Sequence, residues 1–203
     1  MNQKTRAKDL GYLFVVGGPG GSGSSTIAKM LAEHFSLKRV YGGKIFRSKL
    51  KNSGYEDNDK AYFKRNEQFL KKLDKQVDAI LLNEINEPNI LIESKNFAAL
   101  VTKKKIPCTV RIWITASLHV RAQRSLMKHG INPGVRNLYR YFKTRDRLQR
   151  RYEIDASRYS SLYGINYNNP KEYNDIVIDS SHMNEKETFD LILKYIEDGG
   201  YIK

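Results

Sequence analysis

The sequence predicts an α/β fold with three layers, in which helices pack on both faces of a central parallel five-stranded sheet. Unbroken apolar runs alternate along the chain with segments whose apolar residues recur at helical spacing. Unbroken apolar runs are typical of strands buried on both faces, and their alternation with helices favours a parallel sheet with crossover connections. A chain of 203 residues can bury one sizeable core, so we expect a single domain over residues 1–203.

Five segments have the character of buried strands. The clearest are three runs of large apolar residues at 90–92, 112–114 and 176–178. Ligands in sheets of this kind bind beyond the carboxyl ends of the strands. The expected strands cover residues 12–16, 38–41, 89–93, 109–115 and 175–179.

Three helices are expected between and after these strands. Apolar residues follow helical spacing over a long segment from about 57 to 82. Ser117 is a suitable N-cap for a helix over 117–128. Asn184 with Glu187 three residues later is close to a capping box and indicates a last helix over 184–197.

A glycine-rich segment, Gly18 to Thr26, follows the first expected strand and opens a helix-like run. On the pattern G-x-x-x-x-G-K-[ST], Gly18 and Gly23 occupy the glycine positions and Ser25 the hydroxyl position, but Ser24 stands in place of lysine. We therefore expect a phosphate-binding loop that keeps its backbone amides and helix N-terminus but lacks the usual charge. A tight strand-to-helix turn without a ligand is the alternative.

The net charge of +14, from 36 basic and 22 acidic residues, favours polyanionic partners such as nucleotides or nucleic acid. Basic residues are densest over 136–158, where tyrosines are interleaved, as on some RNA-binding surfaces. A solvated charged helix face is the alternative for this region.

The apolar runs and the cysteine count bear on the cellular compartment. No apolar run approaches the roughly 18 residues that a membrane span needs, so we expect no membrane association. The single cysteine, Cys108, excludes an internal disulfide and suits a reducing environment. We therefore expect a cytoplasmic protein.

Six segments, taken in order, resemble the cytidylate kinases of the short archaeal type. Single segments are weakly specific, whereas the ordered set over nearly the whole chain is strong. The resemblance implies a P-loop nucleoside-monophosphate kinase that transfers the γ-phosphoryl group of ATP to CMP or dCMP with Mg²⁺. It also implies a monophosphate-binding helical segment at about 44–84 and a lid at about 128–160. The segments are 17–26, 41–47, 91–95, 112–124, 158–166 and 173–179.

The resemblance implies a nucleotide-binding set in the loop and on one helix. Ser25 would also hold Mg²⁺. Arg121 and Arg124 fall on the ATP side, although packing is an equal alternative for Arg121. The residues implied to bind ATP are Gly18, Pro19, Gly20, Gly21, Ser22, Gly23, Ser24, Ser25, Thr26 and Arg124.

The resemblance also implies an acceptor set and a catalytic set. Arg47 matches the arginine that binds the acceptor phosphate, while Lys44 and Glu93 occupy neighbouring positions of the acceptor site. Residues with the spacing Arg-x₃-Asp-x₂-Arg match the lid helix, and on a helix they share one face. The catalytic set is Lys95, Arg151, Asp155 and Arg158.

Three residues depart from the family pattern: Ser24 replaces a lysine, Lys95 an arginine and Lys44 an aspartate. Losing one such charge-stabilising group lowers the rate on the order of a hundred- to a thousandfold. Either a displaced cation substitutes, for which Lys95 is our preferred candidate, or turnover is reduced. The alternatives to a working kinase are therefore a nucleotide-binding relative without turnover and an RNA-binding protein that uses residues 136–158. In the kinase interpretation we expect a monomer whose partners are ATP and CMP or dCMP.

Overall fold

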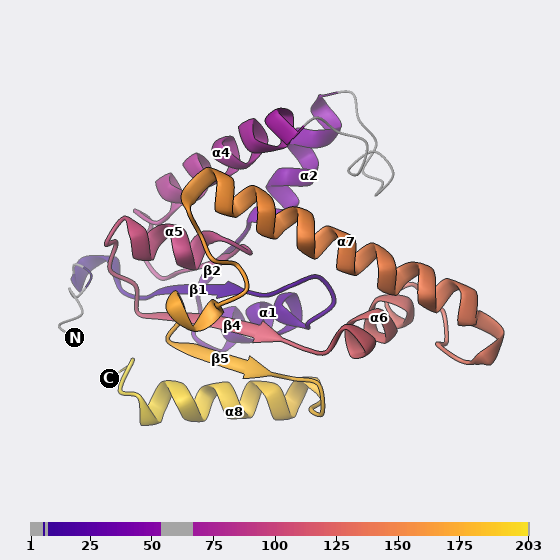
Figure 1. Cartoon of the computed structure of the whole chain (residues 1–203). Helices are drawn as coiled ribbons and strands as arrows, with labels where there is room; N and C mark the ends of the chain where they lie inside the picture. Colours follow the sequence, from indigo (N-terminus) through magenta and orange to yellow (C-terminus); the bar gives the residue numbers. More distant parts are fainter. Residues whose placement is uncertain (1–5, 7, 54–66, 203) are drawn as a thin grey trace.

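The computed structural model describes residues 6, 8–53 and 67–202. Within these residues, five parallel strands form one sheet of order β2-β3-β1-β4-β5 (Figure 1). Each expected strand is confirmed to within one residue at either end. The strands are β1 (Leu13–Gly17), β2 (Lys38–Tyr41), β3 (Ile90–Glu93), β4 (Val110–Thr115) and β5 (Ile176–Asp179).

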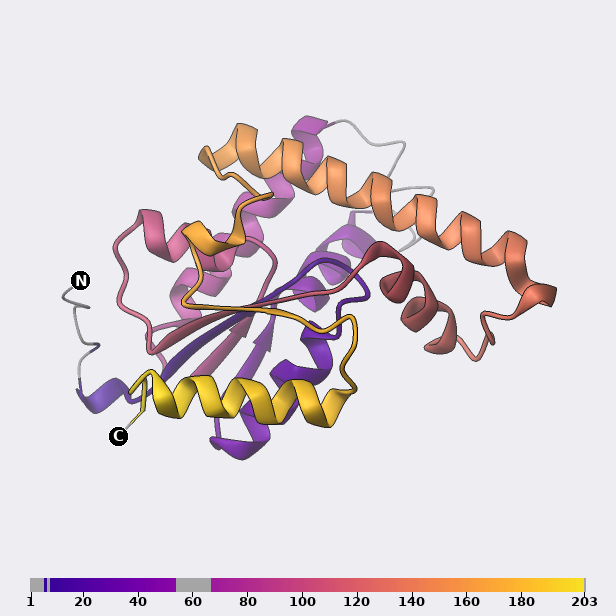
Figure 2. The ribbon, with the colours of Figure 1, turned by 60° about the horizontal axis from the view of Figure 1, so that its bottom comes forward.

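Alternate side chains of the sheet enter two separate cores. In β1, Phe14 and Val16 face α1 (Ser24–His34) and α8 (Glu185–Asp198) on one side. Leu13 and Val15 face α4 (Glu67–Glu84) and α5 (Phe97–Lys103) on the other. This alternation with a period of two places helices on both faces, which is the predicted three-layer architecture (Figure 2).

The remaining long helices lie at the carboxyl edge of the sheet. Helix α2 (Gly42–Asn52) follows β2 directly and packs against α4. After β4, α6 (Leu118–Met127) and α7 (Leu138–Tyr163) form a hairpin that extends beyond the sheet (Figure 1). Short 3₁₀ helices cover Lys8–Leu10, Val135–Asn137 and Pro170–Glu172.

The predicted helix starts are confirmed by their caps. The Ser117 side chain accepts a bond from the backbone amide of Val120 at the start of α6. Asn184 and Glu187 form the reciprocal capping box of α8. The helix expected over 57–82 is α4 from Glu67 onward, and residues 57–66 of that prediction lie outside the described residues. Among the described helices, none is long and apolar enough to cross a membrane.

Candidate functional site

The turn between β1 and α1 is held in a conformation that only glycine adopts readily. Gly21 and Gly23 have φ angles of 84° and 93°, in the left-handed region. A Cβ atom on Gly18 would lie 2.3 Å from the backbone oxygen of Ile114. Gly23 is the N-cap of α1, so the loop ends at the positive N-terminus of that helix. The arrangement suits an anion close to the backbone.

A hydroxyl and a carboxylate meet beside this helix N-terminus. Ser25 Oγ donates to Oε1 of Glu93 over 2.5 Å. Glu93 is the last residue of β3 and is 4% exposed, and Arg39 Nε donates to its other oxygen over 2.9 Å. Hard oxygen donors of this kind are what Mg²⁺ prefers, so the residues present fit a magnesium ion. The carboxylate thus lies beside the start of α1, whereas the sequence resemblance had assigned Glu93 to the acceptor set.

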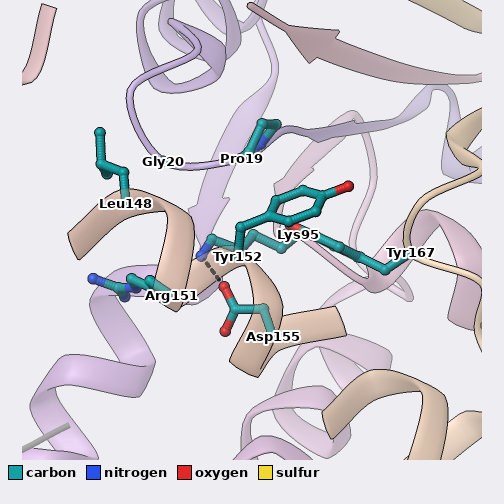
Figure 3. Close-up of a pocket in the computed structure, with 8 residues that line it drawn as sticks. All are labelled: Pro19, Gly20, Lys95, Leu148, Arg151, Tyr152, Asp155 and Tyr167. Atoms are coloured by element: carbon teal, nitrogen blue, oxygen red, sulfur yellow. Dashed lines mark hydrogen bonds and ion pairs between the residues drawn. The ribbon is translucent and has the colours of Figure 1, made fainter. Parts of the chain in front are cut away.

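A small pocket lies between the loop and α7 (Figure 3). Lys95, two residues after β3, enters this pocket and forms an ion pair with Asp155 of α7. The pocket is lined by Pro19, Gly20, Lys95, Leu148, Arg151, Tyr152, Asp155 and Tyr167.

The charges in this pocket are strongly coupled. Burial lowers the pKa of the Lys95 ammonium, and the nearby Arg151 lowers it further, while Asp155 opposes both. Burial works against charge on Asp155, but the positive charges of Lys95, Arg158 and Arg151 outweigh it and hold the pKa of Asp155 below its ordinary value. The site therefore keeps an ionised carboxylate among several cations.

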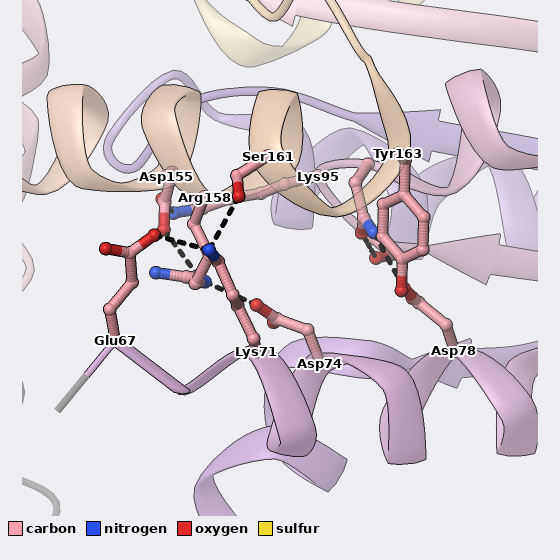
Figure 4. Close-up of polar contacts among 11 residues, drawn as sticks. Glu67, Lys71, Asp74, Asp78, Lys95, Asp155, Arg158, Ser161 and Tyr163 are labelled. Carbon is pink, nitrogen blue, oxygen red and sulfur yellow. Dashed lines mark hydrogen bonds and ion pairs between the residues drawn. The ribbon is translucent and has the colours of Figure 1, made fainter. Parts of the chain in front are cut away.

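Arg158 is turned away from solvent toward α4 (Figure 4). It is 2% exposed, forms a short ion pair with Asp74, and donates from Nη2 to Asp155 over 3.0 Å. Next to this cluster, Asp78 accepts bonds from Tyr163 and Asn96 over 2.6 and 2.9 Å. This network joins α4 to α7. A direct contact of Arg158 with phosphate remains a prediction.

The structure places the other predicted site residues on two separate helices, α6 and α2. Arg124 donates to the backbone oxygens of Ser22 and Ser180 over 3.1 and 2.8 Å, so it holds the loop against the segment after β5. Arg47 lies on α2 with its guanidinium 5.0 Å from the ring centre of Tyr41, and the exposed Lys44 lies one turn earlier. The loop, Lys95, Arg151 and Asp155 converge, whereas the α2 residues form a separate side of the site.

Several contributors to the site were not expected from sequence. Arg39 and Asp74 gave no signal because isolated polar residues on a strand or helix resemble surface residues, and Tyr152 was noted only among the tyrosines interleaved with the basic residues of 136–158. Arg121 is 5% exposed, and its guanidinium lies 5.8 Å from the ring centre of Tyr152. Among the described residues, Arg121 forms no ion pair and its Nε has no hydrogen-bond partner, so a buried cation adjoins the loop at Gly21.

The parallel sheet, the glycine turn after β1 and the pocket at the carboxyl edge define the P-loop kinase fold. A shikimate kinase from Acinetobacter baumannii has a TM-score of 0.55 at 16% identity and covers 94% of this chain and 95% of its own. A gluconokinase from Sinorhizobium meliloti has a TM-score of 0.54 at 15% identity, with 93% of both chains covered. At this identity the likeness shows the fold alone.

The family follows from the sequence comparisons. The model of the cytidylate kinase-like family matches residues 16–182, and the chain belongs to that family. Its similar relatives include a cytidylate kinase from Methanopyrus kandleri, 30% identical over 93% of this chain and 94% of the relative. A cytidylate kinase from Methanocaldococcus jannaschii is 29% identical over 92% and 98%. The family resemblance seen in the sequence is confirmed.

Proposed function

We propose that the protein transfers the γ-phosphoryl group of ATP to CMP or dCMP. The observation that carries this proposal is the convergence of the loop, Lys95, Arg151 and Asp155 around one small pocket, together with the Ser25–Glu93 pair at the start of α1. Phosphoryl transfer needs positioning and charge stabilisation rather than covalent chemistry from the protein. A cationic pocket at a helix N-terminus supplies both. The cytidylate kinase names of the relatives support the choice of acceptor.

The donor phosphates are proposed to bind at the loop. The backbone amides between Gly20 and Thr26 and the N-terminus of α1 would hold the β-phosphate. The Ser25 hydroxyl and the Glu93 carboxylate would hold Mg²⁺, with Arg39 keeping the carboxylate oriented. When bound, the metal ion neutralises charge that develops on the phosphate oxygens.

Lys95 is proposed to replace the missing loop lysine. Ser24, the first residue of α1, can offer only a neutral hydrogen bond, and charge-assisted bonds are roughly twice as strong. The Lys95 ammonium lines the same pocket as Pro19 and Gly20, so it already adjoins the loop. Its ion pair with Asp155 fixes the ammonium in place. A cation from the end of β3 thus takes the role of a cation from α1.

The acceptor monophosphate is proposed to bind between α2 and α7. Arg47 offers a guanidinium that is stacked on Tyr41 and can bind phosphate in a bidentate way. Arg151 enters from the opposite side on α7. The two arginines would align the acceptor phosphate with the pocket in which the γ-phosphoryl group is held, and correct alignment supplies a large part of the rate in such reactions.

A panel of nucleoside monophosphates tests this proposal. Purified protein is incubated with Mg²⁺, ATP and one of CMP, dCMP, UMP, AMP or GMP, and the diphosphate product is measured. We expect turnover with CMP or dCMP and at most slow turnover with purines. ATP binding by calorimetry without transfer to any acceptor would contradict the proposal and support a relative without turnover. Absence of ATP binding up to millimolar concentration would contradict the nucleotide site itself.

A further inference from the structure

The end of the α6–α7 hairpin forms a distinct surface, here called the tip, which comprises residues 127–145. Figures 1 and 2 both show this part of the hairpin extending beyond the sheet and the other helices. It is remote from the two main cores, which lie against the sheet. Its side chains are therefore free to serve a purpose other than packing.

The tip concentrates exposed apolar side chains. In the described part of the chain, six large hydrophobic residues are exposed, and five of them lie in the tip. Val135 is 90% exposed and Tyr139 is 77% exposed. Clustered exposed apolar residues mark an interaction surface, whereas single ones are ordinary. The five are Met127, Val135, Leu138, Tyr139 and Phe142.

The tip is also strongly basic. No Asp or Glu occurs in the sequence between Glu93 and Asp146, so no carboxylate of the tip itself offsets its cations. All five of its lysines and arginines are exposed. A surface of one sign attracts a partner of the opposite sign and repels a copy of itself. The five are Lys128, Arg136, Arg140, Lys143 and Arg145.

Aromatic rings and cations of the tip lie together on a braced helix. The Lys143 ammonium lies 5.8 Å from the ring centre of Tyr139, one helical turn earlier. Tyr141 bonds to Nδ1 of His119 over 2.7 Å, which fixes the start of α7 against α6. With Tyr141 used as the brace, the rings of Tyr139 and Phe142 stay exposed beside the cations.

We propose that the tip binds single-stranded nucleic acid. Cations that follow a phosphate backbone, interleaved with exposed rings on which bases stack, are the chemistry that such strands need. The tip of a second copy would bring the same charge to this face without carboxylates to pair. A membrane surface would need a larger apolar face, because interfacial binding scales with buried apolar area. Here the apolar stripe along α7 ends at Phe142, with Arg145 and Asp146 following on that side. This binding goes beyond the proposed phosphotransfer and does not depend on it.

The test is fluorescence anisotropy with a labelled oligouridylate of about 12 nucleotides, a length within the range bound by single modules. ADP and CMP are present in excess, so that the oligonucleotide does not compete for the proposed catalytic site. Two changes are compared with wild type: Tyr139→Ala, and the triple change Arg136→Ala, Arg140→Ala and Lys143→Ala. Matched controls away from the tip are Tyr195→Ala and the triple change Lys29→Ala, Lys186→Ala and Lys194→Ala.

Tyr139→Ala should weaken binding at least about fivefold, because one stacking contact is lost, with little change in salt dependence. The triple tip variant should reduce the slope of log K against log salt by about 2, since each phosphate contact on a single strand contributes about 0.7. Tyr139→Phe should keep the affinity because it keeps the ring. The control variants away from the tip should change the affinity and the salt slope far less.

Melting curves establish that each variant is folded. The proposal would be overturned if the wild-type protein did not bind the oligonucleotide at micromolar concentration. It would also be overturned if the tip variants and the control variants lost the same amount of affinity for the oligonucleotide. Sedimentation with vesicles of phosphatidylglycerol and phosphatidylcholine forms a further arm. If the tip variants lose vesicle binding while RNA binding is unchanged, the surface binds membranes and the proposal is wrong.

Discussion

Lys95, just beyond β3, and Asp155, in the middle of α7, form an ion pair across the pocket beside the glycine loop (Figure 3). The pair joins the sheet to α7 and holds a cation against Pro19 and Gly20. This contact sets the charge in the pocket and, together with the Arg158–Asp74 pair, helps to hold α7 in place.

Lys95→Ala should lower the phosphotransfer rate about a hundredfold, because it removes the proposed stabilising charge from the pocket. Restoring a lysine in the loop with Ser24→Lys should recover part of that loss. In an otherwise wild-type chain, Ser24→Lys should bring little gain, since a second cation would crowd the first. The measurement is the rate constant for product formation at saturating substrates in all four combinations.

The exposed Lys104→Ala variant is the control for loss of one positive charge. Strictly additive effects of the changes at positions 24 and 95 would exclude compensation between them, since independent sites add.

Arg158→Ala should destabilise the protein strongly. The sequence analysis assigned Arg158 to the catalytic set, with a solvated helix face as the alternative, and removing an exposed arginine costs within about half a kcal/mol. In the structure Arg158 is 2% exposed and pairs with Asp74 and Asp155. Removing it leaves the buried Asp74 carboxylate without its cation, while Asp155 keeps Lys95, and breaking a buried pair in this way costs about 3–5 kcal/mol. Denaturant titration should show this loss as a lower midpoint.

Arg150→Ala is the matched control, because Arg150 is exposed on the same helix. Its free energy of unfolding should change by about half a kcal/mol or less. Equal stabilities of the two variants would contradict the buried role of Arg158.

The contrast at Arg158 illustrates what the sequence could and could not predict. The strands were predictable because their apolar runs are continuous, and the starts of α6 and α8 because Ser117 and Asn184 are strong caps. The spacing of Arg151, Asp155 and Arg158 predicted that they share one face of a helix, but it did not predict which residues pack against that face. Whether a charged face is solvated or buried depends on what packs against it, here Asp74 of α4, and no local pattern records that.

Two helices had no sequence signal of the usual kind. Helix α2 begins with Gly42 and Gly43, which are poor helix formers, and is stabilised by packing against α4. Helix α5 has seven residues, and the five at 97–101 are all buried, so it shows no polar face and no helical period. Tertiary packing decides both elements.

Stability should depend on pH through Asp74. Burial, aided by the neighbouring carboxylates of Asp78 and Asp155, raises the pKa of Asp74 to about 7, although Arg158 opposes the shift. The unfolded value is about 3.9, so the folded state holds this proton more tightly. The stability that this group contributes is fully present below about pH 4 and is lost as the pH rises through about 7.

The comparison of wild type with Asp74→Asn isolates this effect, because the amide does not titrate. The difference in unfolding free energy, wild type minus variant, should fall between pH 5 and pH 8. Asp155 has a lowered pKa, so its contribution is lost only in acid, below this range. Denaturant titrations at four pH values measure the difference. A difference that is flat or rises with pH would show that Asp74 is ionised throughout.

The pair formed by Ser25 and Glu93 should govern the magnesium requirement. Ser25→Ala removes the hydroxyl and Glu93→Gln keeps the side-chain shape while removing the charge, so each takes one hard oxygen donor from the proposed site. The Mg²⁺ concentration for half-maximal activity should rise about 10- to 100-fold, the range found when residues that support a metal site are changed. Calorimetry gives a readout that does not need turnover: ADP affinity should fall in the presence of Mg²⁺ and stay close to wild type in a chelator. A loss of ADP affinity that is equal with and without Mg²⁺ would assign the pair to loop structure instead of metal binding.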